Sequence, residues 1–130
     1  MFILKFKTWR NKKMKTINVE AKPYEYQFKI DETALIIIDM QRDFCAAGGF
    51  GEKLGNDITP TKEIIKPLQE VLTTARDNEM LVIHTREGHR PDLSDCPPSK
   101  LERSRRQGAG IGDEGPMGRI LIRGEYGHDI

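Results

Sequence analysis

The stretch Ala34-Leu-Ile-Ile-Ile-Asp39-Met-Gln-Arg-Asp-Phe44 decides the fold of this chain. Its consecutive aliphatic residues, 35–38, are too few for an ordinary helix and too apolar for a strand with one wet face, so they predict a strand buried on both faces. Asp39 closes the run and begins a polar turn. Because ligands bind beyond the carboxyl ends of strands in open α/β sheets, Asp39 is a candidate catalytic base. The alternative is an acid that only caps the turn.

A second buried strand is predicted at Met80-Leu-Val-Ile-His84. Thr59 followed by Pro60 predicts a helix start, with the hydroxyl as cap, and Pro67 predicts a kink or a true helix start near it. One apolar stripe predicts the amphipathic helix between the strands: Ile64, Ile65, Leu68, Val71, Leu72 and Ala75. The resulting βαβ unit, with its right-handed crossover, would bring Asp39 and His84 to the same edge of the sheet.

Less regular segments flank this unit. Alternating aromatic residues within 17–30 predict an extended edge segment that covers the sheet: Tyr24, Tyr26 and Phe28. Beyond His84 the proline and glycine content predicts a long polar loop to about Gly118, and such loops are usually functional or disordered. The short run Ile120-Leu-Ile122 is a possible third strand.

Several clusters of reactive side chains have simpler explanations than a site. Potential metal ligands crowd residues 84–96, but their spacing matches neither a Cys-x-x-Cys pair nor a His-Glu-x-x-His helix, so a salt-bridged loop is favoured. These residues are His84, Glu87, His89, Asp92, Asp95 and Cys96. A solvated face is favoured over an anion site for the basic cluster of Lys100, Arg103, Arg105 and Arg106. Neither Cys45 nor Cys96 shows the context that activates a thiol.

Composition excludes several classes of protein. With 130 residues the chain forms one domain, and 37% hydrophobic residues with a net charge of +1 separate it from disordered chains and from dedicated nucleic-acid or membrane binders. The apolar runs are far shorter than the roughly twenty residues that span a bilayer. No phosphate loop or dinucleotide fingerprint is present, so we expect no cofactor. The expected location is the cytoplasm, and thiols there are usually reduced.

Residues 1–16 form a basic N-terminal extension. The segment 1–13 carries Lys5, Lys7, Arg10, Lys12 and Lys13 but no acid, together with Phe2, Phe6 and Trp9. A disordered extension, or a start codon assigned upstream of Met14, is favoured over a nucleic-acid arm or an organelle-targeting segment.

Three motifs together resemble the isochorismatase-like cysteine hydrolases, and within them the biuret hydrolases and related amidohydrolases. They are the 34–44 stretch, the loop Gly48-Gly-Phe-Gly51, and Val82-Ile-His-Thr-Arg-Glu87-Gly-His-Arg-Pro-Asp-Leu93. Residues 111–121 and 123–130 extend the resemblance, which runs from about residue 20 to the end.

The resemblance implies a Rossmann-like three-layer α/β/α sandwich with a mostly parallel sheet. It also implies an Asp-Lys-Cys triad that acts on a small amide or ureide such as biuret. Asp39 matches the family's aspartate, and Phe44, Arg86 and Glu87 are the expected substrate-binding residues. No metal is implied.

The family's lysine and cysteine follow a point that corresponds to Ile130. We therefore expect residues 17–130 to be the N-terminal part of one hydrolase domain, inactive alone, and to associate as a homo-oligomer or with a complementing C-terminal half. The alternative is a non-catalytic fragment or interaction subunit of the same fold.

Overall fold

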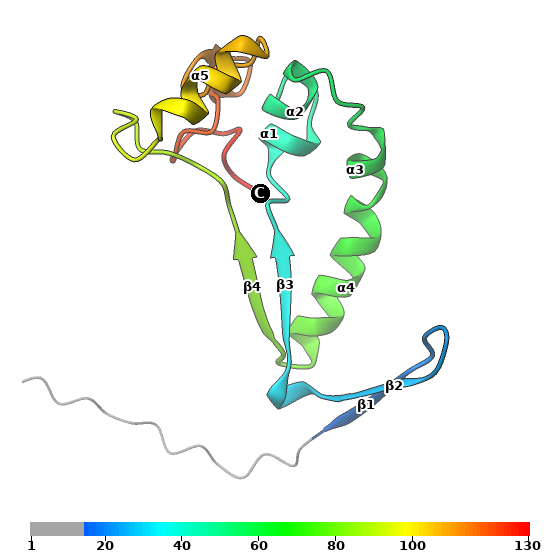
Figure 1. Cartoon of the computed structure of the whole chain (residues 1–130). Helices are drawn as coiled ribbons and strands as arrows, with labels where there is room; N and C mark the ends of the chain where they lie inside the picture. The colour runs from blue at the N-terminus through cyan, green and yellow to red at the C-terminus, as the bar shows by residue number, and fades with distance from the viewer. Residues whose placement is uncertain (1–14) are drawn as a thin grey trace, which may run out of the picture.

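The computed structural model describes residues 15–130, so the predicted basic extension lies almost entirely outside the described residues. The described chain starts with an antiparallel hairpin of β1 (Thr16–Val19) and β2 (Tyr26–Lys29), followed by the 3₁₀ turn η1 (Ile30–Glu32). Figure 1 shows the hairpin projecting from the lower end of the molecule. It is a separate two-stranded sheet, so the prediction that this segment covers the central sheet is wrong.

The predicted βαβ unit is present. Strands β3 (Ala34–Ile38) and β4 (Leu81–Thr85) pair in parallel, with α3 (Thr59–Glu63) and α4 (Ile65–Asp77) between them in sequence. Helix α4 starts two residues before Pro67, in agreement with the predicted helix start. The predicted Thr59 cap is wrong, because Thr59 is itself the first residue of α3 and its N–H donates to Asp57 Oδ1 at 2.9 Å.

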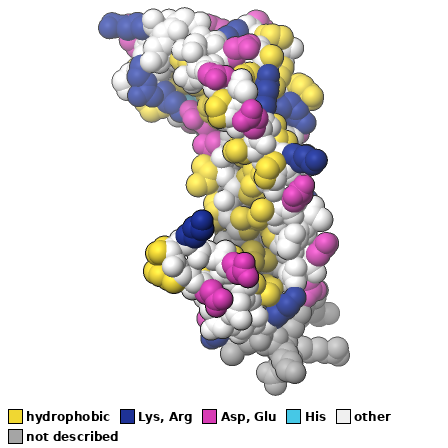
Figure 2. Space-filling model, turned by 90° about the vertical axis from the view of Figure 1, so that its right-hand side faces the viewer, with side chains coloured by type: hydrophobic (Ala, Val, Ile, Leu, Met, Phe, Trp, Pro, Cys, Tyr) yellow, Lys and Arg dark blue, Asp and Glu magenta, His cyan; other side chains and the backbone are white. Residues whose placement is uncertain are grey.

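The β3–β4 sheet is covered on one face only within the described residues. Ile37 is 4% exposed, whereas its neighbours Ile36 and Ile38 are 53% and 66% exposed, and Leu81 on β4 is 61% exposed. The prediction of a strand buried on both faces is therefore wrong for residues 15–130. Side chains alternate across a strand, and α4 packs against one face while no described element packs on the other. Figure 2 shows hydrophobic side chains at the surface of the narrow middle of the molecule.

Residues 40–54 and 86–130 form an upper lobe beyond the carboxyl ends of these strands (Figure 1). It contains α1 (Arg42–Cys45), α2 (Phe50–Lys53), α5 (Pro98–Arg106), and the short strands β5 (Glu114–Gly115) and β6 (Gly118–Arg119). The predicted long loop thus contains a helix. Pro98 at its first turn and the run of helix-forming residues behind it are the signal that sequence reasoning missed.

The core of the molecule lies in this upper lobe. Ile111, Ile120, Leu121 and Ile122 are at most 2% exposed. The possible third strand at 120–122 is not one, because only Ile122 forms an isolated bridge, with His89. Helices and a parallel strand pair establish an α/β fold. Among residues 15–130 no helix is long and apolar enough to cross a membrane.

Candidate active site

Asp39 occupies the position where the two parallel strands end. The register pairs Ile38 with Thr85, which places Asp39 directly beyond the carboxyl end of β3. The Thr85 hydroxyl donates to Asp39 Oδ1 at 2.7 Å, and the Asp39 N–H donates to the Thr85 carbonyl oxygen at 3.2 Å. Thr85 therefore holds the carboxylate in place while the other carboxylate oxygen makes no hydrogen bond within the described residues.

The backbone at Asp39 is left-handed, with φ of 51°. An aspartate tolerates this conformation better than most residues, although it costs more than an extended one. The left-handed residue breaks the alternation of β3 and turns the side chain toward Thr85. Such outliers concentrate at functional sites, and this one coincides with the candidate base.

Gln41, two residues after Asp39, links the turn after β3 to the loop after β4 and to the C-terminal turn. Its side chain is fully buried, and Nε2 donates to the carbonyl oxygens of Glu87 and His128, each at 2.9 Å. Its Oε1 accepts from the Glu87 N–H at 2.7 Å. Both the nitrogen and the oxygen of the Gln41 amide are hydrogen-bonded, so this one side chain fixes the loops after β3 and β4 and the C-terminal turn to one another.

Asp43 fixes the same turn from α1. It is 2% exposed, Oδ2 accepts from the Leu121 N–H at 2.9 Å, and its own N–H donates to the Gly127 carbonyl oxygen at 2.8 Å. Burial raises the pKa of the Asp43 carboxyl, opposed by the Leu121 hydrogen bond and the nearby His128. A Cβ at Gly127 would lie 2.5 Å from Asp43 Oδ1, so glycine is required for this approach.

His128 lies in the C-terminal turn and is 7% exposed. Its ring rests on the backbone of Gly88, where a Cβ would come within 2.2 Å of His128 Cδ2. Burial lowers the pKa of His128, and the Arg86 cation lowers it further. The imidazole is therefore held toward its neutral form. Sequence reasoning missed Gln41, Asp43, Thr85 and His128; the polar residues inside an otherwise apolar 34–44 stretch were the available signal for the first two.

The predicted substrate-binding residues all lie in the upper lobe. Phe44 is half-buried and meets Phe50 edge-to-face at 5.9 Å between ring centroids. Arg86 forms an ion pair with Asp129 at 2.9 Å. Glu87 pairs with Lys100 at 2.5 Å. Each of these side chains has an intramolecular partner, so a substrate would have to share or replace these contacts.

Lys100 leads into a chain of charged groups. Its Nζ is 3.0 Å from His89 Nε2, His89 Nδ1 is 3.4 Å from Asp95, and Asp95 pairs with Arg123 at 3.0 Å. The expected salt-bridged loop is therefore found in part of the 84–96 cluster. The prediction of a solvated face is wrong for Lys100, which these partners half-bury. It is confirmed for the exposed side chains of Arg103, Arg105 and Arg106.

Neither cysteine is prepared for nucleophilic attack. Cys45 and Cys96 are both 7% exposed, and burial raises the pKa of both thiols. This agrees with the prediction that both are bystanders, since a nucleophilic cysteine needs a lowered pKa. Among residues 15–130, no three histidine, cysteine, aspartate or glutamate side chains are grouped to hold a metal ion.

His84 lies near the carboxyl end of β4, at the same edge of the sheet as Asp39, in agreement with the prediction, but its side chain is on a different face from the Thr85 side chain that meets Asp39. It pairs with Ile37 in the register and therefore faces α4. Both of its ring nitrogens are buried without a hydrogen-bond partner in the described structure. The ring lines a cavity of about 320 Å³ between β3, α1 and α4 that Ile130 also lines. The cavity is mainly apolar, and Met40, the residue after Asp39, also lines it.

The arrangement provides a positioned carboxylate that can accept a proton, surrounded by loops locked by buried hydrogen bonds. Comparison with known proteins gives the family independently of this geometry. Residues 33–130 match the isochorismatase domain family. Ureidoacrylate amidohydrolase RutB of Stutzerimonas stutzeri is 33% identical over 72 residues, covering 55% of this chain and 29% of the relative. The RutB protein of Serratia proteamaculans is 27% identical over 126 residues, covering 88% of this chain and 48% of the relative. The chain thus spans less than half the length of these relatives.

Proposed function

Because this chain belongs to the isochorismatase domain family, we propose that it forms the aspartate-bearing part of a cysteine-dependent amidohydrolase. The observation that carries the proposal is Asp39 itself, left-handed at the carboxyl end of β3 and held by the Thr85 hydroxyl. In the proposed reaction Asp39 takes the proton of a cysteine thiol, the sulfur attacks the carbonyl carbon of the amide, ammonia leaves, and water releases the acyl enzyme. No residue of 1–130 is assigned the lysine or cysteine role.

The proposed substrate is a small amide or ureide. Support comes from the RutB relatives, which are named for the hydrolysis of ureidoacrylate, and biuret is the second candidate. Arg86 and Glu87 follow β4 and offer a cation and a carboxylate close to the strand end where Asp39 lies. A ureide presents both a carbonyl acceptor and amide donors, which these two groups and the Phe44 ring would complement.

We also propose that the complete domain is a three-layer α/β/α sandwich. The exposed side chains of Ile36, Ile38 and Leu81 lie on the sheet face opposite α4, where a second helical layer would bury them. Burial of each such side chain contributes about 1.5 to 3 kcal/mol, which is large beside the net stability of a domain. A cytoplasmic location and a homo-oligomeric state are proposals that rest on the resemblance alone.

The decisive experiment is Asp39→Asn in a completed domain, assayed for ammonia release from ureidoacrylate and from biuret. Asparagine tolerates the left-handed backbone and can still accept from Thr85, but it cannot take a proton. Turnover should fall by about 10²- to 10⁴-fold with an unchanged melting temperature. Asp57→Asn is the matched control, because Asp57 is an acid in an exposed turn that accepts from the Thr59 N–H. Near-normal turnover in a folded Asp39→Asn protein would refute the proposal.

The open sheet face favours a second candidate, an interaction subunit without catalysis of its own. In that case a polypeptide that carries the remaining half of the domain should bind this chain and bury the face. Mixing the two and measuring both complex formation and ammonia release separates the candidates: a complex that releases ammonia supports the hydrolase, and a stable complex without turnover supports the interaction subunit.

A further inference from the structure

His84 is the one side chain within residues 15–130 whose buried polar atoms have no hydrogen-bond partner. A neutral imidazole offers one donor and one acceptor, and neither nitrogen of this ring is used. Burying a polar group without a partner costs free energy, so nearly all such groups in folded proteins are paired with protein, water or a ligand. His84 therefore leaves an unmet hydrogen-bonding capacity in an otherwise apolar region.

The His84 ring lines the cavity of about 320 Å³ between β3, α1 and α4. An apolar cavity of about 150 Å³ holds one benzene molecule, so twice that volume admits a ligand of about ten non-hydrogen atoms. Most of the wall is formed by aliphatic and sulfur-containing side chains, namely Ile37, Met40, Cys45, Ile65, Leu68 and Leu72. The cavity thus suits a molecule with an apolar body.

The charges and amides in the wall favour a neutral ligand. The described lining includes no carboxylate, and Arg42 is its one cation. The Arg42 guanidinium is already engaged, because it lies 4.2 Å from the centroid of the Tyr126 ring and 3.7 Å from Asp129 Oδ2. The Gln41 amide is paired on both its nitrogen and its oxygen, and Gln69 is exposed, so water serves its amide. The imidazole is the polar group left for a ligand.

We propose that this cavity binds a small neutral alcohol or phenol, whose apolar body lies beside Leu68 and Leu72 and whose hydroxyl pairs with His84. A hydroxyl both donates and accepts, so it matches either ring nitrogen. No hydrogen bond fixes the orientation of the ring, so rotation about its Cβ–Cγ bond brings either nitrogen toward the ligand. Gln69 and Ile130 line the cavity and are exposed, which gives the ligand a path from solvent.

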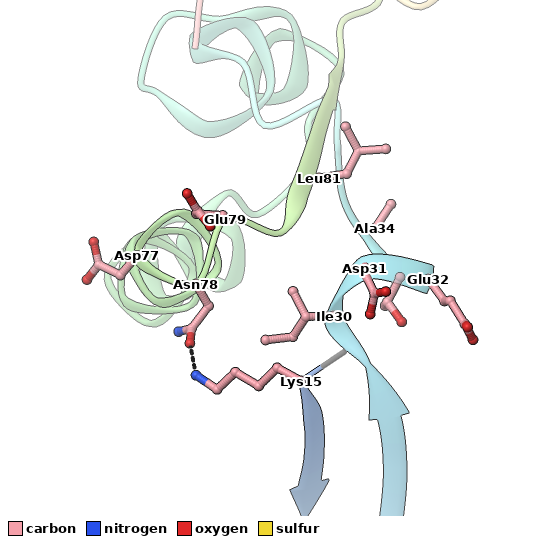
Figure 3. Close-up of a pocket in the computed structure, with 10 residues that line it drawn as sticks. Lys15, Ile30, Asp31, Glu32, Ala34, Asp77, Asn78, Glu79 and Leu81 are labelled. Carbon is pink, nitrogen blue, oxygen red and sulfur yellow. Dashed lines mark hydrogen bonds between the residues drawn. The ribbon is translucent and has the colours of Figure 1, made fainter. Parts of the chain in front are cut away.

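The cleft at the other end of the sheet lacks this feature. It measures about 810 Å³, and Figure 3 shows Ile30 pointing into it and the Lys15 ammonium donating to Asn78 Oδ1. Throughout residues 15–130, the buried side-chain nitrogens and oxygens outside His84 are all paired. Size alone therefore does not mark a binding site, whereas the smaller cavity has an unpaired polar group in its wall.

The test compares two probes that differ only in a hydroxyl group, 2-naphthol and naphthalene. Each is titrated into the full 130-residue chain, and binding is followed by NMR of the Ile65 and Leu68 methyl groups. The dissociation constant of 2-naphthol should be about fivefold lower than that of naphthalene, the effect of one net hydrogen bond. Equal constants would show that water rather than the ligand satisfies His84, and they would overturn the proposal. Methyl signals that neither probe shifts would overturn it as well.

His84→Phe isolates the hydrogen bond, because phenylalanine keeps an aromatic ring of similar size and removes both nitrogens. The preference for 2-naphthol over naphthalene should disappear in this variant, while naphthalene should still bind. A preference that persists in His84→Phe would contradict the pairing of the hydroxyl with His84.

Leu72→Trp tests the cavity itself. The larger indole occupies the space, so both probes should lose their binding. Val71→Trp is the matched control, because Val71 is the preceding residue of α4, is 50% exposed and does not line the cavity. Equal affinity in the two tryptophan variants would place the probes elsewhere and refute the site. Circular dichroism of each variant establishes that the fold is intact. None of these outcomes depends on hydrolase activity, since Asp39 does not line the cavity.

Discussion

Side-chain burial in the upper lobe and in the β3–β4 sheet is the opposite of what the composition of each region predicts. The sheet contains the longest aliphatic run, yet Ile36 and Ile38 are more than half exposed. The upper lobe is rich in glycine, proline and charge, yet it buries Ile120 and Leu121 almost completely. Burial of a side chain depends on how many sides of it are packed by other residues. The upper lobe surrounds its few apolar residues on all sides, whereas the described sheet is packed by one helix on one face.

The largest expected difference between the two regions is in side-chain truncation. Ile120→Ala should lower the free energy of unfolding by about 2 to 5 kcal/mol, because it leaves a cavity in a closed core. Ile38→Ala, the same chemical change at a residue that is 66% exposed, should cost no more than about 0.5 kcal/mol. Urea denaturation of both variants measures the contrast. Equal losses would show that the sheet face is covered in solution.

Gln41 tests whether buried polar contacts lock the upper lobe onto the strand ends. Gln41→Ala leaves the Glu87 N–H and the carbonyl oxygens of Glu87 and His128 without their partner. The expected loss is about 1 to 3 kcal/mol, since a buried group without a hydrogen bond bears its full desolvation cost. Gln69→Ala, at an exposed residue of α4 whose side chain makes no hydrogen bond within the described residues, is the control and should change the unfolding midpoint little. An unchanged midpoint in Gln41→Ala would mean that water replaces the amide.

His128 should make the upper lobe sensitive to acid. Burial places its pKa below the ordinary 6.5, so the unfolded chain binds this proton more readily than the folded chain. Stability should therefore be complete above about pH 6.5 and fall as the pH drops below it, by at most about 1.4 kcal/mol per pH unit. The melting temperature between pH 7.5 and pH 5 measures the slope.

His128→Asn is the matched variant and should flatten this slope. Asp43 has a raised pKa, so its contribution has the opposite sign and falls as the pH rises. Because His128 also lowers the pKa of Asp43, its removal changes the contribution of Asp43 as well, and the difference between the two slopes reports the His128–Asp43 pair. Identical slopes would contradict the assignment.

The smallest expected effect compares ion pairs in the two parts of the chain. A double-mutant cycle on Glu87 and Lys100, which are both half-buried, should give a coupling free energy of about 1 kcal/mol. The exposed pair Lys29 and Glu32 near the hairpin should give about 0.3 kcal/mol. A larger coupling at the exposed pair than at Glu87 and Lys100 would contradict the expected effect of burial.

The sequence by itself determined the βαβ unit, the helix start near Pro67, the family, and Asp39 as the residue at the strand end. These features depend on local periodicity, on proline geometry, and on a motif within a few residues. Only the tertiary structure decided that one sheet face is open among the described residues and that the Thr85 hydroxyl meets Asp39. Segments up to 87 residues apart are joined by the contacts of Gln41, Asp43 and His128. Contacts at that separation depend on how the chain folds back on itself, and no local pattern in the sequence encodes them.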